Sequence, residues 1–275
     1  MTTEKIDTIQ KALDYAIRDA EKKNTQSGYK IGERIYHNYM HNDVWDKYLQ
    51  GIPDDIKNRI KKELAGKPPH MASFGSSCRM AYNRLKKVKN IVFEYGLPTE
   101  VGGEAQLDAY IQAKKIEIFI EAKCREIYKE HYGKKAYKEV YEFLHEWNPK
   151  FDFNEENMTF YYNDEAITYF DLKQLICHFL GIAAAILQHK IRPEVRFLYL
   201  IYNPEKIADD INELYKDKIS TIYKRAKTEI GYFEIWLFDA IVEFQKKHNL
   251  KISETLDYSF EFYVVDQDSC KEFIK

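Results

Sequence analysis

Asp108, Glu121 and Lys123 are the residues of this sequence best suited to chemistry, and they occur in two apolar stretches joined by the short polar link Gln112–Lys115. Side chains alternate between the two faces of a strand, so Glu121 and Lys123 should point to the same side. If the two stretches pair as a hairpin, Asp108 lies opposite Glu121 or opposite the residue two positions before it. Either register brings the two carboxylates close enough to share a cation.

Two carboxylates with no thiolate or imidazole beside them form a hard oxygen site of the kind that Mg²⁺ prefers, and Mn²⁺ could substitute for it. The main-chain carbonyl of Ala122 is placed to act as a further ligand. Lys123 would hold or help to deprotonate a water molecule and offset the charge that builds up on a phosphate. The chemistry that fits these groups is hydrolysis of a phosphodiester by a metal-activated water.

The same residues have a plainer interpretation. Charged residues make up 31% of the chain, so an Asp and an E-x-K pattern can arise by chance, and Glu121 and Lys123 would then lie on the solvated face of a sheet. The sequence that follows favours a site, because a long apolar helix and a buried strand should cover the sheet on both sides. Unpaired charges on a covered face are costly, and a catalytic role would account for them.

The elements that must position these groups mix helices and strands from residue 75 onward. Helices are predicted at 75–89, 125–147, 171–189 and 232–248, and strands at 90–95, 105–111, 116–123, 194–202 and 258–265. Within the strand 105–111, Leu107, Ala109 and Ile111 are expected to form one apolar face. This order predicts an α/β fold, with a central mixed sheet flanked by helices on both sides.

The first part of the chain predicts helices and carries no obvious chemistry. Apolar residues recur at helical spacing in 4–23 and 31–50, and a third helix is predicted from Pro53 to Gly66. We therefore expect a helical N-terminal region, 1–69, packed on a second region, 70–275, that contains the sheet.

The order and spacing of these motifs resemble the PD-(D/E)XK nuclease superfamily. Asp108 matches the aspartate of that motif, and Glu121-Ala122-Lys123 matches its E-x-K. Other segments resemble an uncharacterised bacterial subgroup of the superfamily: Ser76-Ser77 with Asn83-Arg84-Leu85, Phe93-Glu94, Gln174-Leu175 with His178-Phe179-Leu180, and the strand that ends at Tyr202-Asn203-Pro204. The resemblance covers roughly residues 70–204, about half of the chain.

The resemblance implies a restriction-endonuclease-like three-layer core with an N-terminal helical extension, and the activity of a Mg²⁺-dependent deoxyribonuclease (endonuclease). In this reading Lys123, Asp108 and Glu121 are catalytic, and Asp108, Glu121 and Ala122 bind the metal. Additional residues expected at the site are Glu94, Glu104, Gln174, Ser77 and Asn83.

The sequence also departs from the pattern of the subgroup. Cys78 replaces a glutamine, and Cys177 replaces a basic residue. The superfamily often takes another acidic residue from its first helix, but residues 75–89 contain none. Glu94 is the nearest substitute, and these departures leave the second metal open.

Two polar features near the predicted site have alternative interpretations. Gln174 and His178 share a helix face, and we favour a hydrogen-bonded core histidine for His178 over a role at the site. Basic residues on the predicted helix 75–89 could contact a DNA backbone, although such a run is usually a solvated face; they are Arg79, Arg84, Lys86, Lys87 and Lys89.

The composition narrows the classes of protein to which the chain could belong. The net charge of −2 lacks the basic excess of proteins that coat nucleic acid, so DNA would have to be bound by a local basic surface. No apolar run is long enough to span a membrane, and the first ten residues do not resemble a signal peptide, so a cytoplasmic protein is expected. The four cysteines lack zinc-ligand spacing and should be free thiols.

The expected partner is DNA, double-stranded rather than single-stranded, and cutting both strands would call for a homodimer. The alternative is a catalytically inactive module that kept the fold and binds DNA or another protein. DNA and RNA substrates, and roles in restriction, repair or defence, are not distinguished by these residues.

Overall fold

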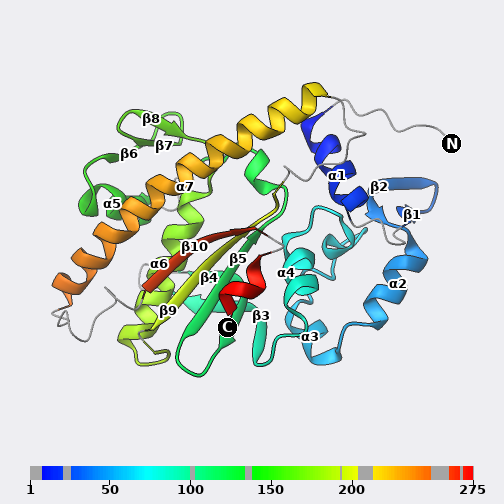
Figure 1. The fold of residues 1–275 in the computed structure, drawn as a ribbon, viewed down its shortest axis with the longest axis horizontal. Helices are drawn as coiled ribbons and strands as arrows, with labels where there is room; N and C mark the ends of the chain where they lie inside the picture. The colour runs from blue at the N-terminus through cyan, green and yellow to red at the C-terminus, as the bar shows by residue number, and fades with distance from the viewer. Residues whose placement is uncertain are drawn as a thin grey trace.

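A computed structural model describes residues 8–20, 26–99, 103–133, 138–192, 194–203, 213–248, 260–266 and 269–274. Its centre is a five-stranded mixed sheet in the order β10-β9-β5-β4-β3 (Figure 1). The strands are β3 (Ile91–Pro98), β4 (Glu104–Gln112), β5 (Glu117–Lys123), β9 (Val195–Ile201) and β10 (Phe260–Asp266). β3, β4 and β5 pair antiparallel, whereas β9 and β10 extend the sheet parallel to β5. The predicted mixed α/β architecture is confirmed.

Helices cover both faces of this sheet. α6 (Leu172–Leu187) packs on β3 and β4 from one side, and α4 (Ser77–Leu85) packs on β4 and β5 from the other (Figure 1). The long α7 (Glu213–Lys247) lies on the α6 side, where the ring of Phe233 contacts Phe262 of β10. A hydrophobic cluster fills each of the two layers.

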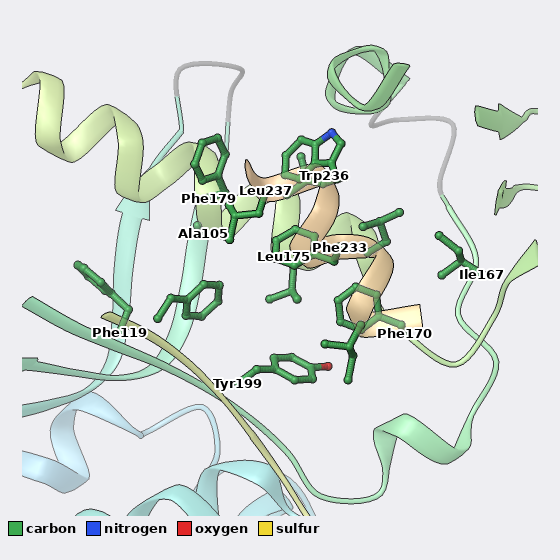
Figure 2. Close-up of a cluster of buried hydrophobic side chains, with 14 of the residues drawn as sticks. Ala105, Phe119, Ile167, Phe170, Leu175, Phe179, Tyr199, Phe233, Trp236 and Leu237 are labelled. Atoms are coloured by element: carbon green, nitrogen blue, oxygen red, sulfur yellow. The ribbon is translucent and has the colours of Figure 1, made fainter. Parts of the chain in front are cut away.

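β5 explains why this part of the sequence is so apolar. All seven of its residues are buried. Phe119 packs with the α6 and α7 cluster, together with Tyr199 and Trp236 (Figure 2). Ile118 and Ile120 pack with the α4 cluster on the opposite face. The strand is therefore covered on both sides, as expected from the sequence that follows it.

The N-terminal region is not wholly helical. The helix predicted over 31–50 is wrong in its first half, where β1 (Ser27–Ile31) and β2 (Arg34–Met40) form a hairpin. Gly32 stands in the connecting turn with φ +57, a left-handed conformation that ends any helix there, and the β-branched and aromatic residues of β2 suit a strand. The rest of the region contains α1 (Ile9–Ala20), α2 (Asn42–Gln50) and α3 (Asp54–Arg59), and the short η1 (His70–Ala72) follows it.

Helix ends and short strands account for the other differences from prediction. The helix predicted over 125–147 is replaced by η2 (Glu126–Tyr128) and α5 (Lys138–Trp147), and a small sheet of β6 (Phe151–Asn154), β7 (Thr159–Tyr162) and β8 (Glu165–Ile167) was not predicted. α7 begins well before the predicted 232, and η7 (Cys270–Ile274) follows β10.

Parts of three predicted elements lie outside the described residues: positions 4–7 and 21–23 of the first helix, 134–137 of the helix 125–147, and 258–259 of the last strand. No helix among the described residues is long and apolar enough to cross a membrane.

Candidate active site

Asp108 lies where β4 and β5 stop pairing. Ala109 pairs with Ile120, and continuing this antiparallel register sets Asp108 opposite Glu121, one of the two predicted registers. The main-chain N–H of Ala122 donates a hydrogen bond of 2.7 Å to Oδ2 of Asp108. A carboxylate therefore takes the position of a main-chain acceptor and meets the E-x-K segment directly.

The alternation of β3 and β4 breaks at this same level. Leu107 packs on the α6 side, whereas Ala109 and Ile111 pack on the α4 side, so the single apolar face predicted for these three residues is wrong. On β3, Glu94 adopts φ +51, a left-handed conformation that interrupts the strand. Because Phe93 pairs with Ala109 and Tyr95 with Leu107, Glu94 lies level with Asp108. Both strands thus change face at a carboxylate.

Glu121 and Lys123 belong to a closed triangle of polar contacts with α6. Lys123 Nζ lies 2.6 Å from Glu121 Oε1 and donates a hydrogen bond of 2.7 Å to Gln174 Oε1. Gln174 Nε2 donates to the same Glu121 oxygen at 2.8 Å. Glu121 is only 2% exposed and Lys123 only 9%. The solvated strand face weighed as an alternative is therefore wrong, and Gln174 reaches the predicted site.

The second oxygen of Glu121 is left without a donor. Oε2 is buried and accepts no hydrogen bond among the described residues. Nε2 of His178 lies 3.7 Å from it, and the same nitrogen lies 3.1 Å from the main-chain oxygen of Gln106. Burial lowers the pKa of His178 to about 3, so the imidazole is neutral and gives Oε2 no charged partner. His178 is a buried, hydrogen-bonded histidine, as favoured from the sequence.

Burial and mutual repulsion raise the pKa values of the carboxyls. Burial, followed by the charge of Glu121, raises the pKa of Asp108 well above its usual range. Burial, then Asp108 and Glu63, raise the pKa of Glu94 to about 8. Burial also raises the pKa of the Cys78 thiol, which stays protonated and hydrogen-bonded to Glu94. The site thus holds more carboxyls than its single lysine could balance if all of them were ionised.

Lys123 is the positive group of the site. Burial disfavours its charge, but the adjacent Glu121 carboxylate outweighs this effect and raises the pKa of Lys123 above its ordinary value. Lys123 is therefore an ammonium throughout the neutral range, able to donate hydrogen bonds but not to accept a proton.

The remaining sequence candidates are placed differently. Ser77 is linked to the end of β5 only through Glu126. Its hydroxyl donates to one oxygen of Glu126, and the other oxygen of Glu126 accepts from the N–H of Cys124. Glu104 is exposed and lines a cavity of about 330 Å³ that also borders Gln174. Asn83 is not part of the site: its side-chain oxygen accepts a hydrogen bond of 2.9 Å from Tyr48 and ties α4 to α2.

Three residues near the site were missed from the sequence. Glu63 follows α3, and its charge helps to raise the pKa of Glu94. No local sequence pattern marks Glu63, because only the fold brings it close to Glu94. Tyr199 is buried opposite Glu121 in the neighbouring β9. Glu126 had a usable signal, since it follows Lys123 by three positions and caps the end of β5.

A hard divalent cation suits the donor set in two respects. Glu121 Oε2 is a buried oxygen with no donor, and the carboxyls of Asp108, Glu94 and Glu121 repel one another. Among the described residues, no group of three or more His, Cys, Asp and Glu side chains is arranged to hold a metal ion. Mg²⁺ needs fewer, because it commonly binds one or two carboxylates and keeps several waters.

Comparisons with models of protein families, with curated proteins and with solved structures find no match for this chain. Its function therefore has to follow from the chemistry of the site.

Proposed function

We propose that this protein is a Mg²⁺-dependent endonuclease that hydrolyses phosphodiester bonds in DNA, with a PD-(D/E)XK active site on a restriction-endonuclease-like fold. The observation that carries the proposal is the meeting of Asp108 with Glu121-Ala122-Lys123 at the point where β4 and β5 part. A mixed sheet covered by helices on both faces is compatible with that fold.

The donor set suggests a division of roles. Asp108 and Glu121 would hold Mg²⁺, or Mn²⁺ in its place, together with the main-chain carbonyl of Ala122. The ion would supply an activated water nucleophile and neutralise charge on the phosphate. Asp108 is held toward this position by the N–H of Ala122.

Lys123 and Gln174 serve the site without moving a proton from water. The ammonium of Lys123 can donate hydrogen bonds to the attacking water or to a phosphate oxygen and offset the charge that develops there. It cannot take a proton at neutral pH, which narrows the role expected from the sequence. Gln174 bonds to both Glu121 and Lys123 and so fixes their relative positions.

Cleavage of supercoiled plasmid tests the proposal. The wild type should nick and linearise plasmid with Mg²⁺ or Mn²⁺ and be inactive with chelator, and Asp108→Asn, Glu121→Gln and Lys123→Met should each lower the rate by at least about 100-fold. Asp152→Asn, in an exposed position on β6, is the matched control and should cut like the wild type. Full activity in folded Asp108→Asn or Lys123→Met protein would refute the assignment.

One observation favours an inactive DNA-binding or protein-interaction module as the second candidate. Lys123, Gln174 and one oxygen of Glu121 satisfy one another without any ligand, as they would in a purely structural triangle. Titration calorimetry with Mg²⁺ distinguishes the two candidates. Binding that is lost in Asp108→Asn supports the nuclease, and absence of binding in the folded wild type supports the module.

A further inference from the structure

The charge of this chain is unevenly distributed along the sequence. Between Lys57 and Lys89 there are ten Lys and Arg residues and a single acidic residue, Glu63, whereas the whole chain has a net charge of −2. Surfaces of soluble proteins usually intersperse both signs, so an excess of this size in one segment calls for a polyanionic partner.

Nine of these ten basic side chains are available at the surface. Lys57 is partly exposed and pairs with Asp54, and the other eight are exposed: Arg59, Lys61, Lys62, Lys67, Arg84, Lys86, Lys87 and Lys89. Within the described part of the chain, Lys61, Lys62, Lys67, Lys87 and Lys89 form no ion pair. We call residues 57–67 and 84–89 the basic surface.

Arg79 does not belong to the basic side predicted for the helix 75–89. It is 2% exposed, and its guanidinium donates to the main-chain oxygens of Ser73 at 3.0 Å and Phe74 at 2.7 Å. Arg79 therefore fixes the segment before α4 and cannot contact a backbone phosphate.

The two halves of the basic surface are joined through the interior, and the half formed by residues 57–67 borders the candidate active site. Ile60, after α3, and Leu85, at the end of α4, belong to the same buried cluster as Phe93 of β3. Glu63 directly follows Lys61 and Lys62 and acts on the charge of Glu94. The basic residues thus begin beside the carboxyls and continue to the far end of α4.

We propose that the basic surface binds the phosphate backbone of duplex DNA and holds it next to Asp108 and Glu121. This inference rests on the proposed function, for which it identifies the surface that grips the substrate. A net charge of −2 is compatible with DNA binding on this surface, because the basic groups are concentrated here and the acidic excess lies elsewhere in the chain. Contacts of this kind recognise charge and spacing, not base sequence.

Binding of a short fluorescent DNA duplex, measured in chelator over a range of salt concentrations, tests the inference without requiring cleavage. Two double variants remove lysines from either half of the surface: Lys61→Gln with Lys62→Gln, and Lys87→Gln with Lys89→Gln. The matched control, Lys224→Gln with Lys227→Gln, removes two exposed lysines from α7, which lies on the opposite face of the sheet from α4.

Each basic-surface pair should weaken binding by roughly tenfold at about 0.1 M salt and lower the slope of log affinity against log salt by about 1.8, while the control stays at the wild-type values. Equal binding by all three variants, or tighter binding of an acidic polypeptide than of the duplex, would overturn the inference. Duplex binding that depends on the surface but gives no cleavage with Mg²⁺ would leave the inference standing and refute the nuclease.

Discussion

Glu121 and Lys123 carry opposite charges into the interior, where the cost of removing them from water must be offset by direct contacts. Lys123 Nζ lies 2.6 Å from Glu121 Oε1 and donates a hydrogen bond to Gln174, and Gln174 donates to the same Glu121 oxygen, so these contacts reach one oxygen of Glu121 only. The other oxygen faces a neutral histidine. An optimised structural ion pair would satisfy both oxygens, so the free one is better explained by a ligand that approaches Glu121.

His178 should make the stability of the protein sensitive to acid. Its pKa is lowered by burial to about 3 in the folded state, from an ordinary value of 6.5, so the unfolded chain binds a proton between these values that the folded chain does not. This contribution to stability is complete above about pH 6.5 and is lost as the pH falls toward 3. His178→Asn should destabilise the protein at pH 7 by about 1–3 kcal/mol through lost packing. Urea titrations at pH 4 should show that the difference in free energy of unfolding between the variant and the wild type has shrunk by on the order of 2–3 kcal/mol. A difference that does not change with pH would contradict the lowered pKa of His178.

At the scale of elements, prediction from sequence succeeded where the period of apolar residues was regular. β5 and α6 follow their patterns, and the hairpin register that sets Asp108 opposite Glu121 follows from the short link between two strands. The β1–β2 hairpin was not predicted, because its apolar residues also fit helical spacing. Only the left-handed conformation of Gly32 distinguishes the hairpin from a helix. The switch of faces at Glu94 and Asp108 has no sequence signal, since alternation gives no warning of where it will break.

The closeness of α6 to the sheet depends on Gly181, one turn after His178. A Cβ on Gly181 would lie 3.0 Å from the Cβ atoms of Ala105 and Leu97 and 3.2 Å from a main-chain oxygen. Gly181→Ala should therefore push α6 away from β3 and β4, lower the free energy of unfolding by about 1–3 kcal/mol, and reduce cleavage by displacing Gln174.

Gly231→Ala on α7 is the matched control for this helix contact. A Cβ at Gly231 meets nothing within 4 Å, so the same substitution should stabilise the protein by up to about 1 kcal/mol through helix propensity alone. Urea unfolding of both variants measures the difference. Equal effects at the two glycines would show that α6 does not need its close approach.

Over the whole molecule, charges of one sign are gathered at two neighbouring places. Acidic groups from three separate segments, Glu63, Glu94 and Asp108, meet beside a surface that is almost purely basic. Folding brings like charges together at each place, and each place lowers stability by self-repulsion. Both costs would be relieved by the ligands proposed here, a divalent cation for the acids and a phosphate backbone for the bases.

The acidic part of this cost should appear as a link between metal binding, protons and stability. The pKa of Glu94 rises from 4.5 to about 8 on folding, so the folded state holds a proton that the unfolded state has lost, and stability falls as the pH rises between these values. Mg²⁺ competes with such protons, because it needs ionised carboxylates nearby.

Mg²⁺ at about 100 times its dissociation constant should stabilise the wild type by about 2.7 kcal/mol at pH 8 and raise its Tm by several degrees. The shift should be much smaller at pH 5 and absent in Asp108→Asn, while Asp152→Asn should respond like the wild type. A Tm that does not change with Mg²⁺ at pH 8 would show that the cation does not bind, and an equal rise in Asp108→Asn would show that it binds elsewhere. Either result would remove the physical basis for the proposed chemistry.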